Sequence, residues 1–328
     1  GRSTVRRSEP PSQANFGLLE RFTKHRRLNA PVASQLARDP ETLQLAKRIG
    51  NCADTLRLNI EVPQDGDPEA RLKAARLCNA RLCPFCEWRR TKGWRRRLIG
   101  GLEQLHADHP KYRALFLTLT VKNVPLSELR GQLQAMQEGW SRMRKGRWFP
   151  TDYWFRRTEI TVGAAPALEL NNWSPYMAHP HFHVLLLVPP SYFSHGYVKQ
   201  TEWQKQWQMA MRLDYAPVID VRVAKAKRLD ADLPLDAAKA AAIEAAKYAS
   251  KQTQLLELGD QLAEFHRQTT NVRYYQTSSG LRKYVSQGEL TEEELMDDSN
   301  PNPNGDLDQL LATAQWFEDT KEYLFTSL

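Results

Sequence analysis

The hydrophobic pattern from residue 113 onward alternates between strand-like and helix-like stretches. Short apolar or alternating runs at 114–121, 153–162, 184–188 and 218–223 are typical of half-buried or buried strands. Apolar residues spaced three and four apart predict amphipathic helices at 126–143 and 203–211. The order strand, helix, strand, strand, helix, strand predicts an α+β fold, a ferredoxin-like βαββαβ domain with a central antiparallel sheet.

A histidine-rich segment, His-Pro-His-Phe-His over 179–183, leads into the third predicted strand. Because side chains alternate across a strand, His181 and His183 share one face and Phe182 lies on the other. Two neighbouring imidazoles suit a divalent metal ion, but they can equally be hydrogen-bonded core histidines. His179 is nominally on the same face, and its role stays open.

A carboxylate on the second predicted strand, Glu159, is the candidate third ligand. In the βαββαβ arrangement the third strand lies between the first and the second, so Glu159 is expected beside His181 and His183. One carboxylate with two imidazoles suits Mg²⁺ or Mn²⁺. The alternatives are a surface glutamate paired with Arg156 or Arg157, and Glu169 in the following loop as the fallback ligand.

An alanine-rich helix is predicted from about residue 236 to 256. Glu244 and Tyr248 are four residues apart and Tyr248 and Lys251 three apart, so the three side chains project from one helical face. A tyrosine between small alanines, with a carboxylate and a lysine nearby, is difficult to explain by packing alone. Tyrosine is a poor nucleophile until a nearby cation favours its phenolate, and Lys251 is placed to do so.

Four cysteines mark the region before residue 109, where apolar residues at helical spacing accompany many arginines and lysines. They are all the cysteines of the chain: Cys52, Cys78, Cys83 and Cys86. Cys83 and Cys86 form a C-x-x-C motif, which grips one ion with two thiolates, and the other two can complete a tetrahedral Zn²⁺ site. Four reduced thiols or two disulfides are the alternatives, and the long gap makes Cys52 the least secure ligand.

The net charge of +8 is unevenly distributed. Residues 288–328 hold eleven acids and one lysine, a net −10, so residues 1–287 carry +18. Such a basic body favours a polyanionic partner, most simply nucleic acid, over a solvated surface. The densest run follows the C-x-x-C motif and interleaves Trp88 and Trp94 with six cations, which fits phosphate contacts and base stacking: Arg89, Arg90, Lys92, Arg95, Arg96 and Arg97.

These patterns divide the chain into five predicted segments. Residues 1–12 form a disordered basic arm, 13–108 a helical DNA-binding region with a four-cysteine zinc site, and 109–257 the domain with the histidine strand and the tyrosine helix. Residues 258–287 extend that core, and 288–328 form an acidic tail. With no apolar stretch of membrane-spanning length and no visible signal peptide, we expect a cytoplasmic protein without a membrane partner.

Together the motifs resemble the rolling-circle replication initiators (Rep proteins) of small bacterial plasmids, within the HUH endonuclease superfamily. The resemblance covers roughly residues 50–255 and is carried, in the family's order, by Cys78…Cys83-Pro84-Phe85-Cys86…Arg89-Arg90, Phe116-Leu117-Thr118-Leu119-Thr120, Thr158-Glu159-Ile160-Thr161, His179-Pro180-His181-Phe182-His183 and Glu244…Lys247-Tyr248…Lys251.

The resemblance implies an activity. Rep proteins bind a double-strand origin and nick one strand through a tyrosine, which leaves a 5′-phosphotyrosyl enzyme and a 3′-hydroxyl primer. It implies Tyr248 as the nucleophile, His181 and His183 as Mg²⁺ or Mn²⁺ ligands with Glu159, and Glu244 as a base that activates water at termination. Lys247 joins the DNA-binding set. Origin DNA, single-stranded or hairpin at the cut, is the implied partner, and a host helicase is left open.

Two other classes remain as alternatives. A transposase or relaxase of the same superfamily shares the histidine pair, although relaxases commonly place the tyrosine before the histidines. A non-catalytic zinc-ribbon DNA-binding regulator needs only the cysteines and the basic run, with the histidines as core residues.

Overall fold

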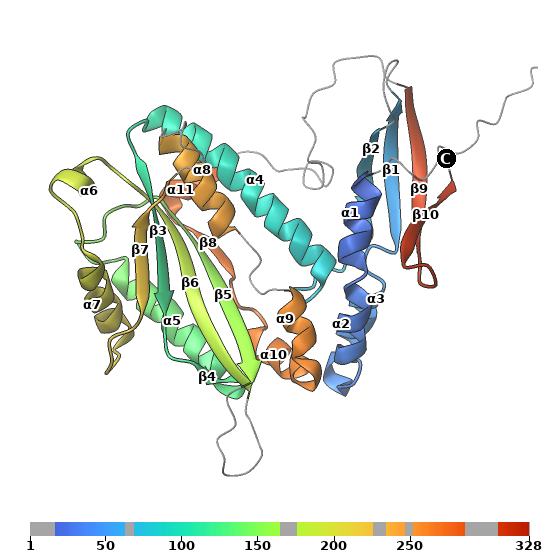
Figure 1. Ribbon diagram of the computed structural model, residues 1–328, viewed down its shortest axis with the longest axis horizontal. Helices are drawn as coiled ribbons and strands as arrows, with labels where there is room; N and C mark the ends of the chain where they lie inside the picture. The colour runs from blue at the N-terminus through green and yellow to red at the C-terminus, as the bar shows by residue number, and fades with distance from the viewer. Residues whose placement is uncertain are drawn as a thin grey trace, which may run out of the picture. The chain divides into compact units, whose positions relative to one another are not determined.

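The structure is a computed structural model that describes residues 17–62, 69–164, 176–225, 234–246, 252–285 and 308–327. The chain divides into two compact units, drawn as ribbons in Figure 1. The first unit comprises residues 1–34, 44–89 and 290–328, and the second comprises residues 35–43 and 90–289.

An antiparallel sheet forms the centre of the second unit. Its strands are β3 (Arg113–Thr120), β5 (Trp154–Ala164), β6 (Tyr176–Val188), β7 (Ile219–Val223) and β8 (Tyr275–Thr277), in the order β7-β3-β6-β5-β8, and the short β4 (Val124–Pro125) pairs with β6. The first four long strands follow the ferredoxin-like order, with the histidine strand β6 between β3 and β5. The predicted α+β fold is confirmed.

The two faces of this sheet are covered by different helices, because the side chains of β6 alternate. Phe182, Val184 and Leu186 pack in one core with α5 (Leu129–Met143) and α7 (Gln200–Met211). Leu185 and Leu187 pack in the other core with α4 (Pro84–Asp108), α8 (Pro234–Ala245) and α11 (Ser279–Val285). His181 and His183 share the second face, so α8 lies over the face that carries the candidate ligands (Figure 1).

The predicted helix from about 236 to 256 corresponds to α8 and the short α9 (Gln252–Glu257), and residues 247–251 between them lie outside the described residues. A four-residue helix, α6 (Ser191–Ser194), follows β6. The segment predicted to extend the core contains η4 (Gly259–Gln261), α10 (Leu262–Thr269), β8 and α11.

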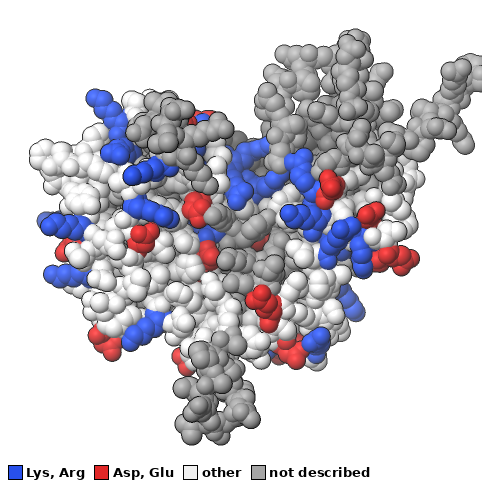
Figure 2. All heavy atoms as spheres, viewed as in Figure 1, with Lys and Arg blue, Asp and Glu red and all other residues white. Residues whose placement is uncertain are grey.

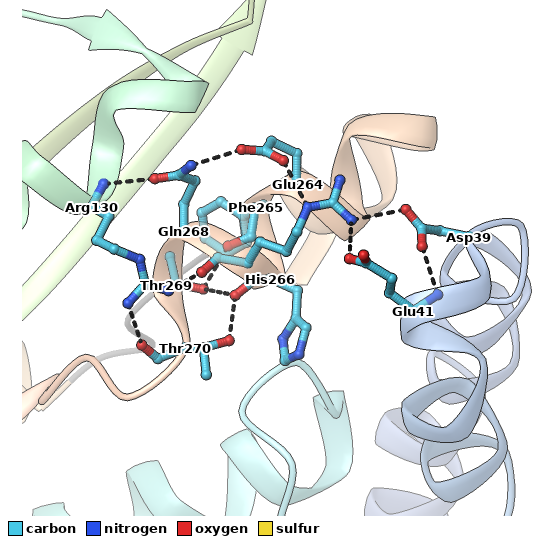
Figure 3. A network of polar contacts seen from close by, with 10 residues as sticks. Asp39, Glu41, Arg130, Glu264, Phe265, His266, Gln268, Thr269 and Thr270 are labelled. Atoms are coloured by element: carbon cyan, nitrogen blue, oxygen red, sulfur yellow. Dashed lines mark hydrogen bonds and ion pairs between the residues drawn. The ribbon is translucent and has the colours of Figure 1, made fainter.

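Helix α10 is held by the polar network of Figure 3. The backbone N–H of Arg130 donates to Gln268 Oε1 at 2.9 Å, and its guanidinium donates to the carbonyls of Arg267 and Thr270. On the other side of α10, Arg267 pairs with Asp39 Oδ2 at 2.9 Å. The network ties α10 to the η3–α5 junction (η3, Leu126–Glu128) and to η2 (Pro40–Thr42), and so anchors the chain that leads into β8.

The first unit contains a second antiparallel sheet that the sequence did not predict. Its order is β10-β9-β1-β2, built from β1 (Thr55–Val62), β2 (Glu69–Ala75), β9 (Asp308–Phe317) and β10 (Glu322–Ser327), with α1 (Gly17–Arg26), α2 (Asn29–Leu36) and α3 (Leu43–Gly50) from the preceding chain. Part of the segment interpreted as an acidic tail is therefore sheet. Thr55 pairs with Gln315, and the Tyr323 hydroxyl donates to the Ala53 carbonyl at 2.5 Å.

Candidate functional site

Glu159, His181 and His183 meet on one face of the central sheet. Glu159 lies opposite His181 in the β5–β6 register, and His183 follows two residues later on the same face. Glu159 Oε1 is 3.7 Å from His181 Nε2, and Glu159 Oε2 is 3.1 Å from His183 Nε2. The three side chains are 12–17% exposed, so they are shielded but still reachable from solvent.

The second ring nitrogen of each histidine is occupied by the protein. His181 Nδ1 lies 3.2 Å from the His179 carbonyl oxygen, which can only accept, so Nδ1 carries the hydrogen and Nε2 keeps its lone pair when the ring is neutral. His183 Nδ1 lies 3.2 Å from Thr118 Oγ1 on β3. Both rings therefore direct Nε2 toward Glu159, as metal-binding histidines do when a neighbour fixes their orientation.

Charge around the carboxylate keeps it ionised. Burial alone would raise the pKa of Glu159, but the polar contacts of its two oxygens with the rings of His181 and His183 and the charge of Arg157 outweigh burial and hold the pKa below its ordinary value. Arg157 contacts Glu159 Oε2 directly. Burial lowers the pKa of His183, although its hydrogen bond with Glu159 acts in the opposite direction, and a lowered pKa favours the neutral imidazole that binds a metal.

The three ligand atoms fit a small divalent ion. In an octahedral Mg²⁺ or Mn²⁺ site with bonds of about 2.1 Å, adjacent ligand atoms are about 3 Å apart. The spacing of 3.1 Å between Glu159 Oε2 and His183 Nε2 is close to this value, whereas that of 3.7 Å between Glu159 Oε1 and His181 Nε2 is longer. One ligand atom from each of the three residues lies within 4.8 Å of the others. The set leaves coordination positions for water or a substrate. The chemistry of one carboxylate and two imidazoles does not select a single metal.

Two contacts at this cluster were not assigned a role from sequence. Thr118 occupies the β3 position opposite His183, a relation that only the strand pairing reveals. The sequence suggested that an ion pair with Arg157 could take the place of metal binding by Glu159. In the structure Glu159 contacts Arg157 and the histidines at the same time.

The remaining predicted catalytic residues are only partly described. Glu244 lies half-buried on α8, within the helix that packs over the histidine face. Tyr248, Lys247 and Lys251 lie outside the described residues, so their assigned roles stay predictions.

The four cysteines converge in the first unit. Cys52 follows α3, Cys78 follows β2, Cys83 directly precedes α4, and Cys86 lies in the first turn of α4. None forms a disulfide, and the Sγ atoms of Cys52 and Cys86 are 3.5 Å apart, those of Cys78 and Cys86 3.7 Å. Tetrahedral Zn²⁺ with Zn–S bonds of about 2.3 Å requires about 3.8 Å between sulfurs, so the set fits zinc with Cys52 as a full member.

A buried asparagine and the start of a helix surround the cysteine cluster. The buried Asn29 accepts at Oδ1 from the Phe85 N–H, 3.3 Å away, and from the Cys83 thiol, and its Nδ2 donates to the Cys52 carbonyl. Burial raises the pKa of the Cys83 thiol, whereas hydrogen bonds from Cys52 foremost lower that of Cys78. Cys83 directly precedes the first residue of α4, where the helix dipole favours a thiolate.

The basic run predicted to bind DNA lies on α4. Its six cations are all half-buried. Trp88 is only 6% exposed and its ring stacks on His25 with centroids 4.4 Å apart, so the expectation that Trp88 stacks on bases is wrong. Trp94 is half-buried and packs between Phe155 and Tyr275. Figure 2 shows lysines and arginines interspersed with acidic side chains over the face in view, not a field of one sign.

Comparison with protein families matches residues 69–324 to replication proteins, the Rep_1 family. The chain belongs to this family. The Rep proteins it resembles include "Protein rep" of Streptococcus pneumoniae serotype 2, 34% identical over 218 residues, and "Protein rep" of Bacillus amyloliquefaciens, 32% identical over 259 residues. The membership predicted from the motifs is confirmed.

The matched stretches do not span the whole of these Rep proteins. They cover 64% of this chain and 61% of the pneumococcal protein, and 76% of this chain and 71% of the Bacillus protein. No solved structure matches the chain. In the described part of this Rep-family chain, no helix combines the length and the apolar character needed to cross a membrane.

Proposed function

We propose that the protein is a rolling-circle plasmid replication initiator that binds a double-strand origin and nicks one strand there. The observation that carries the proposal is the Glu159–His181–His183 cluster on the central strands of a chain that belongs to the replication proteins. A divalent ion held by these residues would neutralise charge on the scissile phosphate and stabilise the leaving oxygen.

Tyr248 is the proposed nucleophile. Its phenolate oxygen attacks the phosphorus, the bond from phosphorus to the 3′ oxygen breaks, and that oxygen takes a proton to become the 3′-hydroxyl primer. The 5′-phosphate stays on the tyrosine. Support comes from α8, which packs over the histidine face and ends at Ala245, three residues before Tyr248. Lys251 is proposed to favour the phenolate.

Glu244 is proposed to act later in the cycle. A carboxylate one helical turn from a phenolate would repel it, which makes Glu244 unsuitable as an activator of Tyr248. As a base toward water it would instead allow hydrolysis or strand transfer at termination. Its half-buried position on α8 is compatible with this role.

The other sites have supporting roles. The cysteine cluster is proposed to bind a structural Zn²⁺, and the α4 cations together with Lys247 to contact DNA phosphates. The five-segment division also remains a proposal, now with β9 and β10 joined to the first unit. A bacterial cytoplasm and a host helicase partner stay predictions.

The test is metal-dependent nicking of a single-stranded origin oligonucleotide labelled at its 5′ and 3′ ends in separate reactions. With Mg²⁺ or Mn²⁺ the protein should form a covalent adduct with the 3′-labelled fragment only. Tyr248→Phe should lose the adduct and keep oligonucleotide binding, and Tyr197→Phe, which alters an exposed tyrosine on the loop after α6, is the matched control.

Three outcomes discriminate among the candidates. No adduct with wild-type protein in either metal would reject nicking and leave the non-catalytic DNA-binding regulator. An adduct retained by Tyr248→Phe would move the nucleophile to another tyrosine. Glu244→Ala should leave the first nick nearly unchanged and impair termination, and equal damage to both steps would make Glu244 structural.

A further inference from the structure

A groove of about 820 Å³ lies in the second unit at the open edge of the central sheet. Strand β8 pairs with β5 on one side and ends the sheet on the other. The groove is lined by β8 and by residues of α4, α5 and α11. It is not the metal cluster, since none of Glu159, His181 and His183 lines it.

The groove has an excess of positive charge. Among the described residues that line it, Asp152 is the one acid and four are arginines: Arg97, Arg144, Arg273 and Arg282. Within the described part of the chain, Arg97, Arg144 and Arg273 form no ion pair with a carboxylate. Arg144 and Arg273 are exposed, so their guanidinium groups can reach an anion from solvent.

Aromatic rings lie between these cations. Trp94 and Tyr275 are half-buried in the wall, with ring centroids 5.4 Å apart and planes inclined by 26°. Arg97 lies over the Trp94 ring at 5.9 Å, and Arg144 over the Trp154 ring at 6.0 Å. Alternating guanidinium groups and aromatic rings are the usual lining of channels for single-stranded nucleic acid, where cations contact phosphates and rings contact bases.

A buried cation behind the wall adds an independent observation. Arg156 is fully buried. Among the described residues its Nε and Nη1 have no hydrogen-bond partner, and its guanidinium lies over the Phe182 ring, 3.9 Å from the ring centroid. Its Nη2 donates to Gln137 Oε1 at 2.5 Å, and Gln137 Nε2 donates to Gln276 Oε1 at 3.1 Å, so the cation is connected to two side chains that line the groove. Burial first, and the charge of Arg144 second, lower the pKa of Arg156 to about 9.

A buried charge without a counterion is unfavourable, and an anion in the groove would relieve it. Gln137, Arg273 and Gln276 also line a second hollow, together with Arg130 and Thr270. These two residues belong to the network of Figure 3, which holds this wall in place.

We propose that the groove binds the phosphodiester backbone of a single-stranded DNA segment that flanks the cut. The register supports a connection to the metal cluster, because Tyr275 of β8 lies opposite Arg157 of β5, and Arg157 contacts Glu159. The identity of the strand rests on the proposed function, whereas strand binding by the groove does not.

The experiment measures binding of fluorescein-labelled oligothymidylate by fluorescence anisotropy in EDTA, so that no nicking takes place. The groove variant is Arg144→Gln combined with Arg273→Gln. The control is Lys111→Gln combined with Lys205→Gln, which removes the same charge from exposed positions outside the groove.

Each phosphate contact to a single strand contributes about −0.7 to the slope of log affinity against log salt, or about fivefold in affinity near 0.1 M salt. The groove variant should therefore bind about 25-fold more weakly than the wild type, with a slope reduced by about 1.4. The control should change affinity by less than about threefold. Equal affinities and slopes for the two variants would overturn the proposal.

A second variant tests the buried cation. Arg156→Met removes the charge and keeps the side chain long and apolar. We expect a higher melting temperature together with weaker oligothymidylate binding, because the unpaired charge that destabilises the fold also attracts the strand. A lower melting temperature with unchanged binding would make Arg156 a packing residue and remove it from the site.

Two further comparisons separate the remaining explanations. If inorganic pyrophosphate at constant ionic strength displaces the oligonucleotide far below the chloride concentration that does so, the groove is a small-phosphate site and strand binding is wrong. If origin nicking is absent but the groove variant still loses affinity, the proposed function fails and the groove stands. If nicking occurs and the groove variant binds the oligonucleotide as the wild type does, the proposed function stands and strand binding by the groove is wrong.

Discussion

The two candidate metal clusters differ in the number of their ligands and in what surrounds them. The first unit brings four sulfurs together, three of the cysteines are buried, and a buried asparagine occupies the neighbouring polar groups. The second unit brings together one carboxylate and two imidazoles, each 12–17% exposed, on an extended strand pair. Four ligands fill a tetrahedral site, whereas three leave positions open.

The comparison teaches where each cluster should act. A closed sulfur site joins the end of α3, the end of β2 and the start of α4, so removing it should affect folding. The open site lies on a sheet that is already hydrogen-bonded and packed on both faces. Removing it should therefore affect the metal-dependent reaction and have little effect on folding. The following predictions test this difference, from the largest expected effect to the smallest.

Cys83→Ser should destabilise the first unit by on the order of 5 kcal/mol, because the ion then loses one of its four ligands and the unit loses the binding free energy. Thermal unfolding followed by circular dichroism, with zinc measured on the purified protein, checks this. Ala74→Ser, at a half-buried position on β2, is the control and should retain zinc. Full zinc content in Cys83→Ser would show that Cys83 is not a ligand, and wild-type protein purified without zinc would show that the cysteines are free thiols.

His183→Ala should reduce metal-dependent nicking on the order of 10³-fold, since losing a ligand forfeits several kcal/mol of transition-state stabilisation. The melting temperature should change little, because the imidazole is 17% exposed. Single-turnover nicking in Mn²⁺ provides the measurement, and His195→Ala, at an exposed histidine, provides the control. Loss of folding without a specific loss of nicking would make His183 a core residue.

Asn29→Ala should lower the free energy of unfolding by about 1–3 kcal/mol, since the Phe85 N–H and the Cys52 carbonyl lose a buried partner. Denaturant unfolding with and without chelator checks this result. Asn51→Ala, at an exposed position beside Cys52, should be near neutral. An Asn29→Ala loss that appears only in nicking would contradict a structural role for the cysteine cluster.

Thr118→Val should weaken Mn²⁺ binding by about 10- to 100-fold, because His183 loses the hydroxyl that orients its ring. Thr120→Val is a control on the same strand: Thr120 lies opposite His181, but its hydroxyl donates to the Val218 carbonyl at 2.6 Å and not to a ligand ring. Titration of nicking against Mn²⁺ separates the two variants. Equal Mn²⁺ dependence would show that Thr118 does not position the ligand.

Local sequence was sufficient for several features. The period of two in 179–183 assigns His181 and His183 to one face, and the strand order then places Glu159 beside them, as the structure confirms. The short C-x-x-C spacing likewise identified Cys83 and Cys86 as two candidate ligands of one ion. In both cases the decisive geometry is set within a few residues or by one adjacent strand.

Other features depend on contacts between distant segments. The sheet of the first unit pairs Thr55 with Gln315, and no local pattern names a partner at that distance. Trp88 stands in a basic run typical of a nucleic-acid surface, yet it is buried against His25 and Phe22. The groove at β8 gathers arginines from four separate segments of the second unit.

The sequence by itself indicated the family, the α+β fold and the candidate ligands of both metal clusters, with Cys52 the least secure of them, because side-chain alternation and motif spacing are properties of the local backbone. The tertiary structure alone decided that Cys52 completes the cysteine cluster, that Thr118 orients His183, and that Arg156 is buried behind a basic groove. These arrangements arise from packing and pairing between segments that are far apart along the chain, and local pattern does not encode them.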